Sequence, residues 1–187
     1  SLELGGKSSL LVFADADLDL AVELACGGGF FNAGQMCSAT SRVLVAAELL
    51  EEFLARLQVR AEAIRVGDPL EPGVEMGALV NQAQYQLWRE EIFGPVLCVR
   101  SFVSEQEAIE LANDSEFGLV ASVVSGDASR AERVANALQA GLVWINAPQV
   151  IFPQTAWGGY KQSSIGRELG PWGLQAFQEI KHVIRAL

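Results

Sequence analysis

The sequence predicts an α/β protein in which a parallel sheet lies between layers of helices. Short apolar segments of strand length alternate with longer segments whose apolar residues recur every three or four positions. This alternation of strands and helices is typical of a parallel sheet. Half of the 187 residues are apolar, which is enough for one well-buried domain.

The first half of the chain holds two predicted strands and two predicted helices. The strands are expected at residues 9–14 and 42–46, where short apolar runs are bounded by polar residues. A helix is expected between them at residues 18–25, preceded by acids that suit its positive end and fraying at three glycines. Residues 48–65 form an amphipathic helix whose apolar face holds Leu50, Phe53, Leu54, Leu57, Ala61 and Ile64.

The second half continues the alternation. Its expected elements are strands at 92–102, 119–125 and 142–146 and helices at 76–86, 105–112, 128–140 and 171–178. Ser104 and Glu107 have the spacing of a capping box, and Asp127 caps the next helix. Gly141 is expected to end that helix in the left-handed conformation. Residues 149–170 form a long irregular loop of the kind that is often functional.

Composition excludes several classes of function. The net charge is −10 without a basic run, which argues against nucleic acid and anionic membranes as partners. The apolar runs are too short to span a bilayer. Three cysteines without a paired pattern indicate free thiols in a reducing, cytoplasmic setting. With one histidine and no Cys-x-x-Cys pair, we expect no metal site.

Cys37 is the first candidate for chemistry. It lies in the stretch GGGFFNAGQMCSATSR at residues 27–42, whose small residues let the backbone approach a bound molecule. A free cysteine can equally be a small buried hydrophobe. Glu3 lies in the apolar, glycine-rich stretch LELGGK at residues 2–7. There it is either a solvated charge or a desolvated acid able to act as a base near neutral pH.

Five motifs together resemble the aldehyde dehydrogenase superfamily and follow its order along the chain. They are LELGGK at 2–7, GQMC at 34–37, EIFGPV at 91–96, WIN at 144–146, and WGGYK at 157–161 leading to GRE at 166–168. The resemblance covers nearly the whole chain. It implies the three-layer α/β catalytic domain of that fold and the oxidation of a small-molecule aldehyde with NAD or NADP as cofactor.

The resemblance also assigns roles to residues. It implies that Cys37 is the nucleophile and Glu3 the general base. Glu91 and Phe93 match positions that hold the ribose on the nicotinamide side, although alone they read as a solvated acid and a core aromatic. Leu4 matches a position whose backbone lies near the nicotinamide. The family resemblance further implies a homo-oligomer.

The wording of the motifs looks most like betaine-aldehyde and aminoaldehyde dehydrogenases, which bind a cationic aldehyde in an aromatic box. Trp157 matches one wall of that box, and Phe31 matches another. Leu142 is expected to narrow the pocket from behind. From the residues alone, the Trp157 indole is either a lid over the core or a face for a cation.

The organisation follows from the same comparison of motifs. Residues 1–178 are expected to form the catalytic domain, and residues 179–187 an edge strand for oligomerisation. Family members carry further elements where residues 86 and 87 adjoin, which predicts an internal deletion, and the chain opens inside a motif without methionine, which predicts a fragment. Two alternatives remain: an inactive fragment that only packs or oligomerises, and a thioester-forming hydrolase with His182 as its imidazole base.

Overall fold

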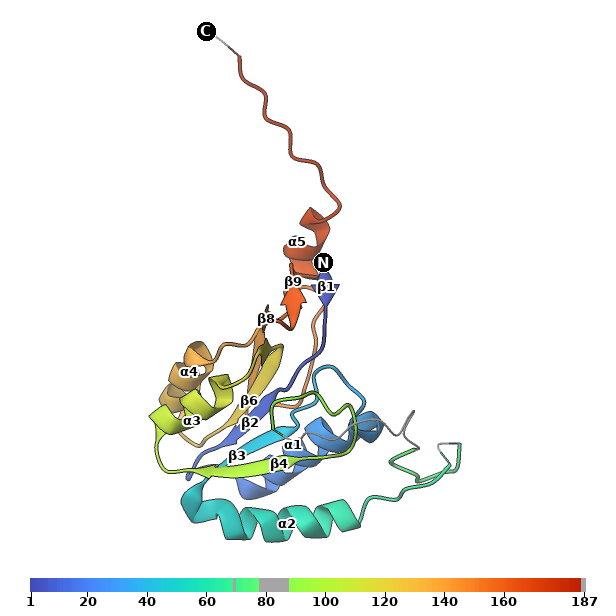
Figure 1. Ribbon diagram of the computed structural model, residues 1–187, viewed down its shortest axis with the longest axis vertical. Helices are drawn as coiled ribbons and strands as arrows, with labels where there is room; N and C mark the ends of the chain where they lie inside the picture. Colours follow the sequence, from blue (N-terminus) through green and yellow to red (C-terminus); the bar gives the residue numbers. More distant parts are fainter. Residues whose placement is uncertain (69, 78–87, 186–187) are drawn as a thin grey trace.

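The computed structural model describes residues 1–68, 70–77 and 88–185, and its centre is a five-stranded sheet (Figure 1). The strands lie in the order β4-β3-β2-β6-β7, and every neighbouring pair is parallel. Their bounds are β2 Ser9–Val12, β3 Arg42–Ala46, β4 Cys98–Phe102, β6 Val120–Val124 and β7 Leu142–Ile145. The predicted parallel α/β sheet is therefore confirmed.

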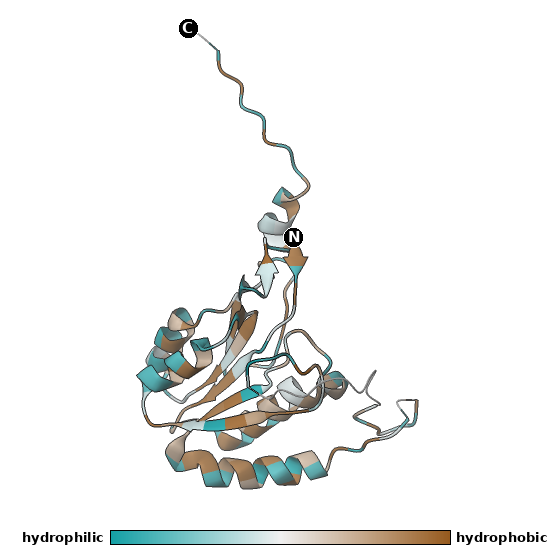
Figure 2. Ribbon diagram, viewed as in Figure 1, coloured by the Kyte–Doolittle hydropathy of each residue, from teal (hydrophilic) through white to brown (hydrophobic). Residues whose placement is uncertain are grey.

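Helices cover both faces of this sheet and make the fold three-layered. One face carries α1 (Leu18–Phe30) and α2 (Leu50–Glu62), and the other carries α3 (Glu105–Asn113) and α4 (Ala128–Ala137) (Figure 1). Successive strand residues point to opposite faces. Leu10 and Val12 thus pack toward α1 and α2, whereas Leu11 packs toward α3 and α4. Figure 2 shows the strands as mainly hydrophobic and the helices as mixed.

The predicted helix starts have the expected side-chain caps. Asp17 accepts from the N–H groups of Asp19 and Leu20 at the start of α1, and Asp127 caps α4 in the same way. At α3, Ser104 accepts from the Glu107 N–H, whereas the Glu107 carboxylate accepts from Val103 instead of Ser104. These caps satisfy N–H groups that have no partner inside the helix.

Several predicted boundaries are wrong. Helix α1 continues through its three glycines to Phe30, and the Leu97 side chain packs closely against the helix at Gly29. The strand predicted at 92–102 is ordered as β4 only from Cys98, and its earlier residues form an irregular loop. Helix α4 ends at Ala137, and Gly141 is not left-handed; its backbone lies against Gly158. Leu54, placed on the buried face of α2, is exposed.

Short elements complete the fold. They are β1 (Leu2–Glu3) paired with β9 (Ser164–Ile165), β5 (Phe117–Gly118) paired with β8 (Tyr160–Lys161), the 3-10 turns η1 (Phe31–Gly34) and η2 (Ala47–Leu49), and α5 (Gly170–Gln175). After α5 the chain runs away from the sheet (Figure 1), and residues 179–185 form no strand within this chain. A pairing of this arm with another chain stays a prediction. The helix predicted at 76–86 falls mostly outside the described residues.

Cys26, Cys37 and Cys98 are all free thiols. Within the described ranges, no helix is long and apolar enough to cross a bilayer. The same residues bring together no group of three or more potential metal ligands of the His, Cys, Asp and Glu types.

Candidate active site

The residues predicted for chemistry gather at one edge of the sheet. Glu3 precedes β2, Cys37 precedes β3 and Glu91 precedes β4 in the chain. These strands are neighbours and run parallel, so the segments that enter them meet at the amino-terminal edge of the sheet. The sheet topology therefore explains why three segments far apart in sequence share one place.

Glu3 is held by a short antiparallel pairing. It forms β1 with Leu2 and lies opposite Ser164 of β9, and the Leu4 N–H donates to the Ser163 carbonyl over 2.8 Å. The loop at residues 149–170 thus supports the segment that carries the carboxylate. Leu4 lies beside Glu3 with its side chain exposed.

Cys37 follows a tight turn. Asn32, Ala33 and Gly34 all have positive φ angles, of 52°, 55° and 70°. Asparagine and glycine tolerate this conformation, whereas alanine does so at a cost of about 1–2 kcal/mol. Gly34 is also needed for close approach, since a Cβ there would lie 2.2 Å from the Gly94 carbonyl oxygen. The turn breaks the path of α1 and presents Cys37, half-buried, before β3 begins.

Cys37 and Glu3 are in direct contact. The thiol donates to Oε1 of Glu3 over 3.3 Å. The pKa of Cys37 is raised to about 11, first by burial and then by the hydrogen bond to Glu3 and its negative charge, while the N–H of Ser38 acts in the opposite direction. The thiol is therefore protonated near neutral pH, and a carboxylate that can serve as a base for another group lies beside it.

Glu91 lies on the other side of the Gly5–Gly6 turn. Its Oε1 accepts from the Gly6 N–H over 3.1 Å, and a Cβ on Gly5 would lie 2.3 Å from its Oε2. Gly5 has a φ of 102°, so glycine is required there on both counts. Burial raises the pKa of Glu91, while the Gly6 hydrogen bond and the charge of Lys7 act against this. The turn therefore brings Glu91 next to the segment that carries Glu3.

Phe93 is exposed and strained. Its φ is 53° and 44% of its surface is accessible. A bulky residue in the left-handed region is an outlier, and such strain clusters at functional sites. Phe93 precedes Gly94, whose carbonyl lies against Gly34 of the cysteine loop. The predicted cofactor loop and the predicted nucleophile loop therefore pack directly on one another.

Two of the three predicted substrate residues belong to, or pack against, the same apolar cluster as Cys37. Trp157 is buried with Leu119, Val120 and Trp144, and Cys37 and Leu142 pack against this group. The backbone of Trp157 is held by two hydrogen bonds of 2.7 Å to Glu168. Phe31 lies outside this cluster, on η1, with 66% of its surface exposed. Cys37, Trp157 and Leu142 therefore share one apolar cluster.

Arg42 links several segments near the site by hydrogen bonds. The sequence analysis placed it only at the start of a strand. Arg42 is 2% exposed and donates to the carbonyls of Lys7, Leu111 and Ala112. Burial lowers its pKa to about 10, so it stays charged at neutral pH. It connects the entry to β3, just after the cysteine loop, to the entry to β2, just after Glu3. In the sequence, the charged residue at the start of an otherwise apolar strand was the signal that could have identified Arg42.

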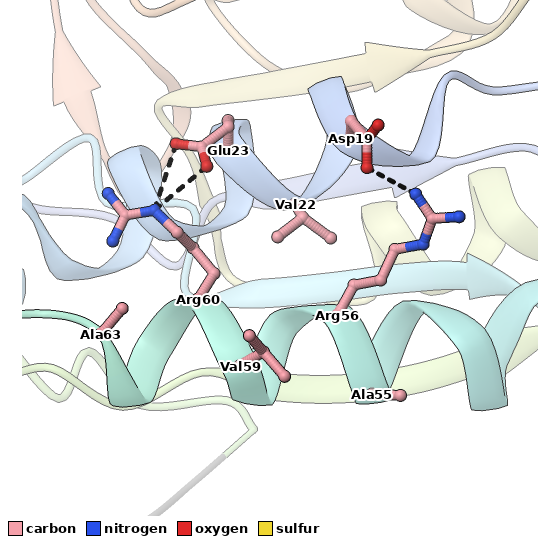
Figure 3. Close-up of a pocket in the computed structure, with 8 residues that line it drawn as sticks. All are labelled: Asp19, Val22, Glu23, Ala55, Arg56, Val59, Arg60 and Ala63. Atoms are coloured by element: carbon pink, nitrogen blue, oxygen red, sulfur yellow. Dashed lines mark hydrogen bonds and ion pairs between the residues drawn. The ribbon is translucent and has the colours of Figure 1, made fainter.

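The cavity drawn in Figure 3 lies elsewhere. It has a volume of about 550 Å³ between α1 and α2, and none of the predicted catalytic residues lines it. Arg56 pairs with Asp19 and Arg60 pairs with Glu23 across it, over Val22 and Val59. The charged side chains at this groove therefore already have partners. We interpret the groove as the interface between two packed helices.

The chain matches a known protein family along nearly its whole length. The sequence pattern of the Aldehyde dehydrogenase family matches residues 1–88 and 84–183. Betaine aldehyde dehydrogenase 1 of Oryza sativa subsp. japonica and the peroxisomal aminoaldehyde dehydrogenase 1 of Pisum sativum are each 43% identical over 230 residues, covering 99% of this chain and 46% of theirs. The chain therefore spans about half the length of the curated relatives it matches.

Solved structures agree. A betaine aldehyde dehydrogenase from Staphylococcus aureus, solved in complex with NAD+, is 38% identical with a TM-score of 0.90, over 94% of this chain and 44% of that one. The match confirms the predicted fold class, and the share covered is that of one part of a larger enzyme. The parallel three-layer fold, the matched sequence pattern and these relatives lead to one conclusion: the chain belongs to the aldehyde dehydrogenase family.

Proposed function

We propose that this chain carries the catalytic cysteine and general base of an NAD(P)-dependent enzyme that oxidises an aldehyde to a carboxylic acid. The contact between Cys37 and Glu3 carries the proposal. A thiol and a carboxylate from two separate segments meet at the edge of the sheet, beside an apolar wall that an aldehyde can contact. Oxidation of an aldehyde through a thioester needs these two side chains.

Cys37 and Glu3 act in turn. The sulfur of Cys37 adds to the aldehyde carbon while the thiol proton passes to the carbonyl oxygen, which gives a thiohemiacetal; that proton is lost to solvent when the hydride leaves. A nicotinamide cofactor, when bound, supplies the acceptor for the hydride that leaves this carbon. The thioester that remains on Cys37 is then attacked by water. Glu3 accepts a proton from that water, the carbon–sulfur bond breaks and the acid leaves, and the proton then passes from Glu3 to the sulfur, which restores both side chains.

The residues predicted to hold the cofactor suit its ribose. Glu91 offers a half-buried carboxylate that can accept from sugar hydroxyls, and it lies next to the Glu3 segment. Phe93 presents an accessible ring on the loop that packs on the cysteine turn. Leu4 follows Glu3 directly and keeps its side chain exposed. The NAD+ complex of the Staphylococcus aureus relative supports NAD as the cofactor.

We propose a cationic aldehyde, betaine aldehyde or an aminoaldehyde, as substrate. The names of the relatives from Oryza sativa and Pisum sativum support this class. Trp157 and Leu142 supply an aromatic and an aliphatic side chain in the cluster that Cys37 packs against. The exposed ring of Phe31 would have to turn toward the site to complete an aromatic box.

The alternative of a hydrolase with an imidazole base has little support. Cys37 has a carboxylate as its partner, and His182 lies on the exposed arm that runs away from the sheet (Figure 1). On the same arm, Phe177, Ile180 and Ile184 are more than 80% exposed, which supports an oligomerisation role for residues 179–187. The cytoplasmic location stays a prediction, since some of the relatives are named as peroxisomal or chloroplastic.

An internal deletion at residues 86 and 87 also remains a proposal. The family pattern matches in two stretches that meet at residues 84–88. The alignments extend over 230 residues although the chain has 187, so they contain positions that this chain lacks. Both observations support a segment that the relatives have and this chain does not.

Glu3→Gln in the complete protein that carries this chain tests the proposed function. With aldehyde and NAD in excess, we expect a burst of NADH equal to the enzyme concentration, followed by a steady rate at least about 100-fold below that of the parent. Cys37→Ser should abolish both phases. Loss of the burst in Glu3→Gln would contradict Glu3 as the deacylation base, and full activity of Cys37→Ser would contradict the proposal altogether.

A further inference from the structure

The loop after β7 reaches across the site and grips the residue next to the nucleophile. Gln149 makes two reciprocal hydrogen bonds with Ser38: the Ser38 hydroxyl donates to Oε1 over 3.2 Å, and Nε2 donates to the Ser38 carbonyl over 3.3 Å. Ser38 is 4% exposed. One amide thus satisfies both a side-chain and a main-chain group of a buried residue, which a hydrocarbon side chain could not do.

Gln149 is itself anchored to the sheet. The next residue, Val150, accepts at its carbonyl from the indole N–H of Trp144 over 2.9 Å. Trp144 lies on β7 and is buried in the cluster that Cys37 packs against. The amide of Gln149 is also confined by α1, because a Cβ on Gly28 would lie 3.2 Å from its Nε2. The grip on Ser38 is therefore connected to the rigid part of the fold.

Ser38 in turn bears on the reactive sulfur. Its main-chain N–H hydrogen-bonds to Cys37 and lowers the pKa of the thiol, against the effects of burial and of Glu3. That N–H stabilises the negative sulfur only while it points at it. Rotation of the Cys37–Ser38 peptide would lose this donor, and the two bonds from Gln149 oppose it by fixing the side chain and the carbonyl of Ser38.

We propose that Gln149 is a positioning residue for the nucleophile, holding Ser38 so that its main-chain N–H faces the sulfur of Cys37. The proposal rests on the function proposed above only in calling Cys37 the nucleophile. Gln149 touches neither sulfur nor base in this structure, and it acts through Ser38.

The test is the alkylation rate of Cys37 by iodoacetamide at pH 8, followed by peptide mapping in the complete protein. Gln149→Leu keeps most of the volume and removes both hydrogen bonds. We expect labelling about three- to tenfold slower, because a hydrogen bond to a charged group is lost. Gln154→Leu, an exposed glutamine of the same loop, is the matched control and should label at the parental rate.

The direction of the change separates positioning from general loosening. Burial is the largest cause of the raised pKa of Cys37, so a loosened site would admit water, lower that pKa and speed labelling. Faster or unchanged labelling in Gln149→Leu would overturn the proposal. Ser38→Ala removes one of the two bonds and should slow labelling by a smaller factor, and the double variant should match Gln149→Leu alone. Ser38→Ala also decides the matter if Gln149→Leu does not fold.

The measurement needs neither aldehyde nor nicotinamide. Slow labelling of Gln149→Leu, together with a parent protein that does not oxidise aldehydes, would support the positioning role and refute the proposed function. Parental labelling of Gln149→Leu, together with normal aldehyde oxidation by the parent protein, would refute the positioning role and support the proposed function.

Discussion

The sulfur of Cys37 lies 3.3 Å from Oε1 of Glu3 and donates its proton to it. The two residues belong to different loops and meet because β2 and β3 are adjacent and parallel. Burial and this carboxylate raise the pKa of the thiol to about 11. At rest the pair is therefore a neutral thiol beside a carboxylate, and the sulfur becomes a strong nucleophile only after the thiol loses its proton.

This arrangement predicts how Cys37 responds to pH and to Glu3→Gln. Because its pKa is about 11, alkylation of Cys37 should rise about tenfold per pH unit from pH 7 to 9 without a plateau. Glu3→Gln removes the negative charge that disfavours the thiolate. Labelling at pH 8 should then be roughly three- to tenfold faster. Iodoacetamide labelling with peptide mapping measures both.

Glu179→Gln provides the control, since this carboxylate lies on the exposed arm and should leave the rate unchanged. A plateau below pH 8 would show that the thiol is not held protonated by its surroundings. Slower labelling in Glu3→Gln would mean that the carboxylate promotes the thiolate, contrary to the structure.

Trp157 is predicted to discriminate charge in the substrate. Trp157→Ala in the complete protein should raise KM for a cationic aldehyde about tenfold, which corresponds to about 1.4 kcal/mol of lost cation–π binding. A neutral aliphatic aldehyde of similar length should be affected much less. Steady-state kinetics with both substrates measures the ratio.

The indole is also part of the core, with 9% of its surface exposed, so truncation will cost stability. Trp157→Phe keeps an aromatic ring with a smaller cavity and should retain most of the preference for the cation. Equal losses for the two aldehydes in both variants would show that Trp157 only shapes the wall.

Gly34 is predicted to be indispensable to the cysteine turn. Its φ of 70° disfavours any side chain, and a Cβ would lie 2.2 Å from the Gly94 carbonyl oxygen. Gly34→Ala should lower the free energy of unfolding by about 2–3 kcal/mol, combining backbone strain with displacement of the Glu91–Phe93 loop. Urea denaturation measures the change.

Gly27→Ala is the matched control on the preceding helix. Nothing lies within 4 Å of a Cβ at Gly27, and its backbone is helical. Alanine there should stabilise the protein by up to about 1 kcal/mol. A Gly34→Ala variant as stable as Gly27→Ala would show that the two loops do not pack as described.

Local features of the sequence were sufficient for much of the fold. Apolar runs marked the sites of β2, β3, β6 and β7, and Asp17, Ser104 and Asp127 marked helix starts. These signals work because strand burial and helix capping depend on residues close together in the chain. Glycines led to wrong helix ends in α1 and at Gly141. At Gly29 and Gly141 the glycine allows close packing of a neighbouring residue and does not form a turn.

The sequence by itself determined the residue types at the site: a cysteine after small residues, a glutamate in a glycine-rich turn, and the motifs that carry the family resemblance. Only the tertiary structure decided which of them touch. Parallel order placed Glu3, Cys37 and Glu91 at one edge, brought Cys37, Trp157 and Leu142 into one apolar cluster, and left Phe31 exposed. It also joined Gln149 to Ser38 across 111 positions. Such contacts depend on the order of strands in the sheet, and no periodicity along the chain encodes that order.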